Sequence, residues 1–164
     1  MRRASRAAAP LVLLALAAAG CGFGEQLTKR GFVQEGDAIC GETLLRAGLV
    51  LERSRRQGQP TSIADSIETL AAAYRDAASN LSRLELGDGD AALRDDMVSE
   101  FRATAGALRA AAEQAAAGNP GAQGAASSAV AELAPLSREL RDYGFEVCGG
   151  RAPATASASS APAT

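Results

Sequence analysis

The stretch IADSIETLAAAYRDAASNLSRL, residues 63–84, carries the clearest structural pattern in the chain. Its apolar side chains recur at alternating steps of four and three residues, which is the spacing of one face of an α-helix packed in a left-handed bundle. Ser62, with Asp65 three residues later, forms a weak capping box before this stretch. The apolar face comprises Ile63, Ile67, Leu70, Tyr74, Ala77, Leu81 and Leu84. We therefore predict a helix that packs against other helices through this face.

Three further helical patterns accompany this one, and short junctions separate them. Their approximate ranges are 32–57, 90–117 and 120–147. The apolar face of the second of these comprises Leu93, Met97, Phe101, Thr104, Leu108, Ala111 and Ala115. Pro135 lies inside the last range and removes a backbone donor, so we expect a kink there. Helices of similar length with short connections favour an all-α, up-down-up-down four-helix bundle.

The first residues have the layout of a secretory signal peptide. Arg2, Arg3 and Arg6 precede an apolar run over residues 7–19, which ends in small side chains. This run is about 13 residues long, whereas spanning a bilayer takes about 20, so a permanent transmembrane helix is the less favoured alternative. We therefore expect residues 1–20 to be a leader that is removed.

The leader ends in Ala18-Ala19-Gly20-Cys21, which resembles the lipobox of bacterial lipoproteins. Ala18 stands where that pattern prefers Leu. The resemblance implies cleavage before Cys21 and a lipid on its sulfur, which would anchor the protein at the extracytoplasmic face of the cell membrane. Residues 21–31 would then be a flexible tether. The alternative is ordinary secretion with cleavage after Ala19, which leaves Cys21 a free thiol.

Composition narrows the classes of function. The chain contains no histidine, which excludes histidine acid–base catalysis, histidine triads and histidine-ligated metals. Loss of the leader would leave 14 basic and 19 acidic side chains, a charge of −5, which argues against nucleic acid as a partner. Aromatic residues make up only 4% of the chain, so its core buries little area per residue and a covalent cross-link would help.

Two acidic groups are candidate sites of chemistry. Asp88 and Asp90 have the spacing that begins a calcium loop, but acidic ligands are missing at its fifth and twelfth positions. Capping of the next helix and compensation of its dipole are the favoured interpretation. Asp95, Asp96 and Glu100 share one side of a predicted helix, where a solvated face is favoured over carboxylate chemistry. We predict no catalytic residue, no cofactor and no metal site.

Cysteine parity favours one disulfide. The chain has Cys21, Cys40 and Cys148, and lipidation of the first leaves an even pair in an oxidising compartment. Cys40 lies near the start of the first predicted helix and Cys148 follows the end of the fourth. Four antiparallel helices would bring these two points to the same end of the bundle. Two buried thiols are the alternative, and a redox-active pair is less favoured because the chain has no CxxC spacing.

Residues 32–40, FVQEGDAIC, and residues 142–149, DYGFEVCG, resemble the two ends of a family of small actinobacterial lipoproteins. Phe145 stands where that family tends to have Leu. The resemblance implies a helical domain over residues 32–149 and an envelope location, and it supplies no catalytic residues. Residues 150–164 are rich in Ala, Pro, Ser and Thr, so we expect a disordered tail.

Taken together, these patterns predict a membrane-anchored, non-enzymatic binding or accessory module. Its partner would be an envelope protein or a small apolar ligand held between helices. The alternatives are a structural spacer without a ligand and, less favoured, an enzyme that uses carboxylates.

Overall fold

The computed structural model describes residues 26–56 and 62–150, with side chains given for residues 26–49 and 62–150. Within these ranges the chain forms five α-helices and one isolated β-bridge, which confirms the predicted all-α class. The helices are α1 (Lys29–Arg56), α2 (Ile63–Leu81), α3 (Asp88–Ala116), α4 (Ala122–Ala131) and α5 (Ala134–Tyr143). Among the described residues, no helix combines the length and the hydropathy that a bilayer span requires. The leader, Cys21 and the tail from Arg151 onward lie outside the described residues.

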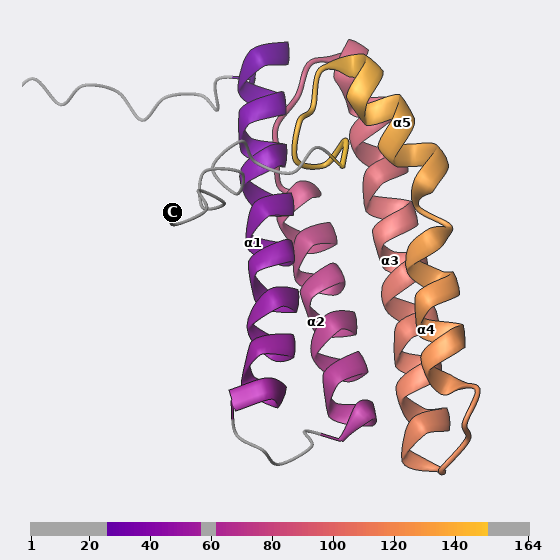
Figure 1. Cartoon of the computed structure of the whole chain (residues 1–164). Coiled ribbons are helices and arrows are strands. Elements are labelled where there is room, and N and C mark those ends of the chain that lie inside the picture. Colours follow the sequence, from indigo (N-terminus) through magenta and orange to yellow (C-terminus); the bar gives the residue numbers. More distant parts are fainter. Residues whose placement is uncertain (1–25, 57–61, 151–164) are drawn as a thin grey trace, which may run out of the picture.

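Successive long helices run in opposite directions along the bundle (Figure 1). Helix α2 packs against both α1 and α3, and α3 packs against α4. Helices α4 and α5 follow one another with a short break between them, and together they run antiparallel to α3. The start of α1 and the end of α5 therefore lie at the same end of the bundle.

The first boundary of the folded domain lies earlier than predicted. The Leu27 amide donates a hydrogen bond to the Glu85 carbonyl at 2.8 Å, and Leu27 forms a bridge with Leu86. The Thr28 hydroxyl then accepts from the Gly31 amide at 3.2 Å, as a helix cap does. Residues 26–31 thus belong to the bundle and not to the predicted tether, because Leu27 packs against the core.

The fourth predicted helix is two helices. Helix α4 ends at Ala131 and α5 begins at Ala134, with Pro135 in the first turn of α5. Pro135 has no amide proton to donate to the Ala131 carbonyl, and its ring would collide with that carbonyl. The prediction of one kinked helix was therefore wrong, because the proline ends one helix and starts another.

The core divides into two clusters of different composition. The cluster at the end where the chain begins and finishes holds the bulky side chains, and its Phe32 and Phe145 rings meet edge to face at 5.2 Å. The cluster near the opposite end is mostly small side chains: Ile67, Ala71, Leu108, Ala111, Ala112, Ala126 and Ala129. Because alanines bury little area, the first cluster supplies most of the apolar burial.

Candidate functional site

Residues 144–150, here called the closing segment, complete the bundle after α5. Gly144 begins the segment with φ of 126°, a conformation that favours glycine. The predicted disulfide is present: Cys148 is bonded to Cys40 of α1, with 5.4 Å between the two Cα atoms. The closing segment is thereby fastened to the first helix.

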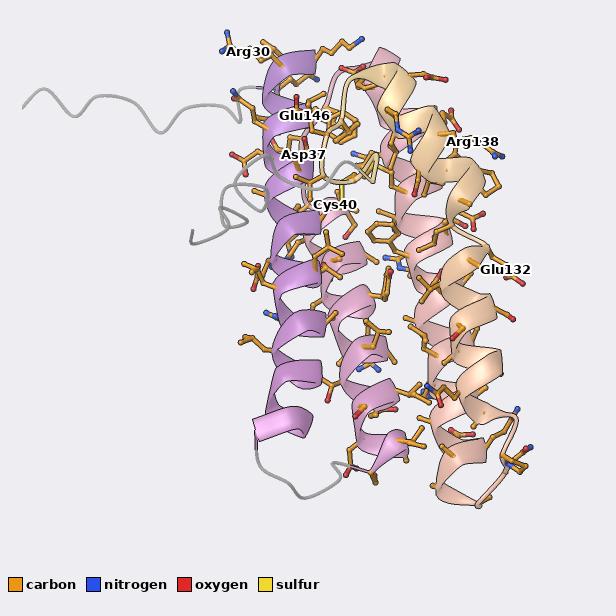
Figure 2. All side chains as sticks on the ribbon, in the orientation of Figure 1. Arg30, Asp37, Cys40, Glu132, Arg138 and Glu146 are labelled. Atoms are coloured by element: carbon orange, nitrogen blue, oxygen red, sulfur yellow. A yellow bond between two sulfur atoms is a disulfide. The ribbon has the colours of Figure 1, made fainter. Side chains whose placement is uncertain are left out.

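Asp37 of α1 holds the closing segment a second time. Its Oδ1 accepts hydrogen bonds from the amides of Val147 and Cys148, both at 2.9 Å, and its Oδ2 accepts from the Glu146 amide at 2.9 Å. Figure 2 shows Asp37, Cys40 and Glu146 together at this end of the bundle. Hydrogen bonds to a carboxylate are stronger than neutral ones, so one side chain orients three successive residues.

Two further contacts attach the closing segment to the helices. A Cβ on Gly36 would lie 2.5 Å from the Phe145 ring, so this ring packs directly on the α1 backbone. Arg141 of α5 donates two hydrogen bonds to the Gly149 carbonyl, at 2.9 and 2.7 Å. Both ends of the closing segment are therefore fixed, one on α1 and the other on α5.

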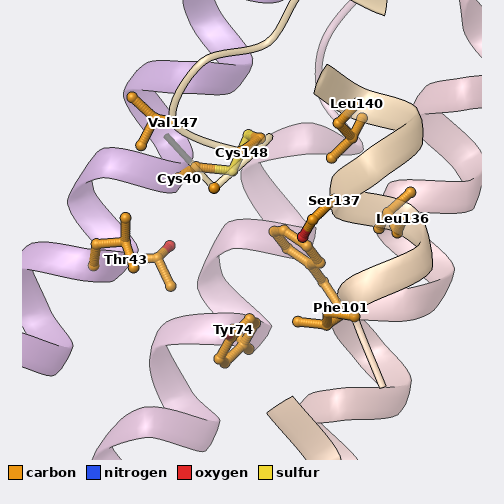
Figure 3. Close-up of a pocket in the computed structure, with 12 residues that line it drawn as sticks. Cys40, Thr43, Tyr74, Phe101, Leu136, Ser137, Leu140, Val147 and Cys148 are labelled. Carbon is orange, nitrogen blue, oxygen red and sulfur yellow. A yellow bond between two sulfur atoms is a disulfide. The ribbon is translucent and has the colours of Figure 1, made fainter. Parts of the chain in front are cut away.

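A pocket of about 150 Å³ lies beneath the closing segment, between α1, α2, α3 and α5 (Figure 3). The disulfide forms part of its wall. Its lining includes Thr43, Leu44, Tyr74, Phe101, Leu136, Ser137, Leu140 and Val147. None of the described residues that line it carries a charge.

The break between α4 and α5 helps to create this pocket. Leu133 at the break, together with Leu136 and Leu140 of α5, forms the apolar wall opposite α1. On the α1 side, Thr43 is the last buried residue whose side chain is described. Leu44 follows it with 55% of its surface exposed, so the pocket opens to solvent beside α1.

Three hydroxyl groups are the polar side-chain groups of the pocket. In Figure 3 Thr43 and Ser137 point into it from opposite sides. The Thr43 hydroxyl donates to the Ile39 carbonyl at 3.0 Å, so toward the pocket it can only accept. The Tyr74 ring meets Phe101 edge to face at 5.5 Å, and burial raises the pKa of Tyr74. The tyrosine thus stays protonated and neutral at physiological pH.

A wider surface groove of about 740 Å³ lies at the same end, beside the start of α1. Its lining carries charges of both signs, from Lys29 and Arg30 and from Asp37 and Glu146. Asp37 already holds the closing segment, and Lys29 Nζ lies 4.1 Å from the centre of the Tyr143 ring. Because part of this lining already holds the fold, the groove is a weaker candidate for a ligand than the pocket.

The acidic residues singled out from the sequence lie away from the pocket. Asp95 and Asp96 are exposed on α3, and Asp95 pairs with Arg94 at 2.7 Å. Asp88 begins α3, and Asp90 in its first turn accepts a hydrogen bond from the Tyr143 hydroxyl. Both acids lie in the first turn of α3, as dipole compensation predicts, but the N-cap is Gly87 and no side chain caps this helix, so the expected capping role is wrong.

Comparison of the chain with known protein families, with curated proteins and with solved structures gives no match.

Proposed function

We propose that this protein is a lipid-anchored extracytoplasmic module that binds a small apolar molecule in the pocket and catalyses no reaction. The observation that carries the proposal is an uncharged pocket between helices, bounded by four helices and a covalently fastened closing segment. Ligand sites in helical bundles are concave, mostly apolar and equipped with a few polar groups. An apolar cavity of about 150 Å³ is known to hold benzene, so the pocket suits a single ring.

The anchor is the second part of the proposal. The lipobox-like residues 18–21 support a lipid on Cys21 and membership of the small actinobacterial lipoproteins, and a disulfide suits an oxidising compartment. Helix α1 begins at Lys29, eight residues after Cys21. Eight residues span at most about 28 Å, so the pocket end of the bundle would stay near the membrane surface.

A second candidate function is that of an accessory subunit bound to an envelope protein. Leu45 and Leu49 of α1 are 70% and 66% exposed, and they lie about one helical turn apart. A partner that covers them would remove this apolar surface from water. Because nothing about these two leucines specifies the partner, ligand binding in the pocket is the stronger proposal.

Toluene titration of the disulfide-intact protein tests the pocket. Chemical-shift changes should centre on residues that line it and saturate. Ser137→Leu should fill the pocket and abolish these changes. Ser127→Leu, an equivalent change at an exposed position of α4, should leave them intact. Absence of saturable binding to the native protein, or equal binding by the Ser137→Leu variant, would refute pocket binding.

Substitution at Cys21 tests the anchor. Cys21→Ser should move the protein from the membrane fraction into the medium, because the lipid attachment atom is gone. The folded domain keeps its Cys40–Cys148 disulfide, so helix content measured by circular dichroism is the control. Retention of the variant in alkali-washed membranes would contradict the lipid anchor and would leave the pocket proposal unaffected.

A further inference from the structure

We infer that the ligand of the pocket is an uncharged molecule about the size of one six-membered ring, carrying one neutral oxygen that accepts a hydrogen bond from Ser137. The inference rests on the proposed function and specifies the chemical class of the ligand.

The uncharged lining disfavours an ion. None of the described residues around the pocket carries a charge, and the disulfide and apolar side chains form most of its wall. A carboxylate or ammonium group moved there from water would lose its hydration without gaining a counter-charge. Neutral ligands avoid this loss, so the pocket selects against charged ones of the same size.

Ser137 supplies the directional contact. It is half-buried on α5, it points into the pocket in Figure 3, and it makes no side-chain hydrogen bond with any other described residue. Thr43 differs, because its hydroxyl proton is already donated to Ile39. A wholly apolar ligand would desolvate the Ser137 hydroxyl without giving it a partner, whereas a carbonyl or hydroxyl oxygen restores the bond.

Tyr74 is the other possible donor in the pocket. Its ring forms the floor together with Phe101, and the two rings are nearly perpendicular at 87°. Ser137, which points into the pocket in Figure 3, is the proposed partner, and Tyr74→Phe separates the two possibilities.

Matched ring compounds test the inference. Cyclohexanone, methylenecyclohexane and cyclohexanecarboxylate share one ring and differ in bearing a neutral oxygen, no oxygen or a charge. Their dissociation constants would be measured by NMR titration at pH 7 with the native protein, Ser137→Ala and Tyr74→Phe. Affinity for methylenecyclohexane serves as the internal control for an intact pocket.

Ser137→Ala should weaken cyclohexanone binding about three- to tenfold, the range typical of one hydrogen bond, and should not weaken methylenecyclohexane binding, because the hydroxyl that this ligand leaves unpartnered is gone. Tyr74→Phe should preserve the preference for the ketone, and the carboxylate should bind more weakly than the ketone. If methylenecyclohexane binds while Ser137→Ala leaves ketone affinity unchanged, the inference is wrong and the pocket function stands. Carboxylate binding as tight as ketone binding also overturns it. If no ring compound binds, both proposals fail.

Discussion

Asp37 accepts a hydrogen bond from the Cys148 amide at 2.9 Å, and Cys148 is bonded through sulfur to Cys40, three residues further along α1. Residues three apart share one face of a helix. The closing segment is therefore attached to the same face of α1 by a covalent bond and by a charge-assisted hydrogen bond. Because α1 holds the closing segment in place, α1 also determines where this segment covers the pocket.

Replacing Asp37 should weaken this attachment while the disulfide remains. Asp37→Asn keeps one acceptor oxygen but turns an amide nitrogen toward backbone donors, and we expect a loss of about 2 kcal/mol in the free energy of unfolding. Urea unfolding followed by circular dichroism measures it. Glu35→Gln, an exposed charge removal in the same helix, should stay within about 0.5 kcal/mol. Equal unfolding free energies for the two variants would show that the hydrogen bonds of Asp37 to the closing segment do not stabilise the fold.

Removing the disulfide should cost more. The two cysteines are 108 residues apart, and the chain-entropy treatment gives about 4–5 kcal/mol for so long a loop. Cys40→Ala combined with Cys148→Ala should therefore lower the unfolding free energy by a large share of the usual total of about 5–15 kcal/mol. Non-reducing peptide mapping of the native protein should recover the linked pair. Free, alkylatable thiols at both positions would count against the cross-link.

Two glycines of α1 should respond oppositely to the same substitution. Gly36→Ala places a methyl group against the Phe145 ring and should destabilise by about 1–3 kcal/mol. Gly41→Ala meets open space and should stabilise by about 0.5–1 kcal/mol, because alanine has the higher helix propensity. Both are measured by urea unfolding. Destabilisation of similar size at the two positions would show that the Phe145 contact is not the cause.

Tyr143 should lose its proton at a higher pH than an ordinary tyrosine. Two effects raise the pKa of Tyr143 from 10 to about 12. Partial burial is the larger one, and the hydrogen bond to Asp90 is the next. The folded protein then binds this proton more tightly than the unfolded chain does. Its contribution to stability is complete below about pH 10 and is lost as pH rises toward 12.

Tyrosinate absorbance can measure this shift because the chain has only two tyrosines. The difference between native protein and Tyr143→Phe isolates Tyr143, since Tyr74, whose pKa is also raised, is present in both. Asp90→Asn should bring the Tyr143 titration closer to pH 10. A native Tyr143 that already titrates near pH 10 would contradict the contact with Asp90.

Helix periodicity predicted α3 well and α2 less well. On α3 the residues predicted to face the core, from Leu93 to Ala111, are all buried. Most of them are large apolar side chains, which identify the buried face of a helix clearly. On α2 the predicted Ile63 is 56% exposed, whereas Ala71 and Ala78 are fully buried. Alanines occur on every side of α2, so their burial depends on how closely the neighbouring helices approach, which spacing along one helix does not reveal.

The disulfide could be predicted, and most of the site could not. The even number of cysteines left after lipidation and the even number of predicted helices both indicate a Cys40–Cys148 pair. Both observations depend only on positions along the chain. The role of Asp37 depends on three amides more than 100 residues away. The pocket likewise depends on the break before α5, which the sequence suggested only as a kink at Pro135. Pro135 is visible in the sequence, but the burial of Leu133, Leu136 and Leu140 in the core depends on contacts with residues far away along the chain.

The cross-link between the two ends has a mechanical consequence. If the described domain is pulled from Gln26 at one end and from Gly150 at the other, tension runs from Gln26 to Cys40, crosses the disulfide, and leaves through residues 148–150. The residues enclosed by the disulfide, including α2 to α5, carry none of the tension. Such a pull can directly unravel only the start of α1, so the disulfide shields most of the bundle from the applied force.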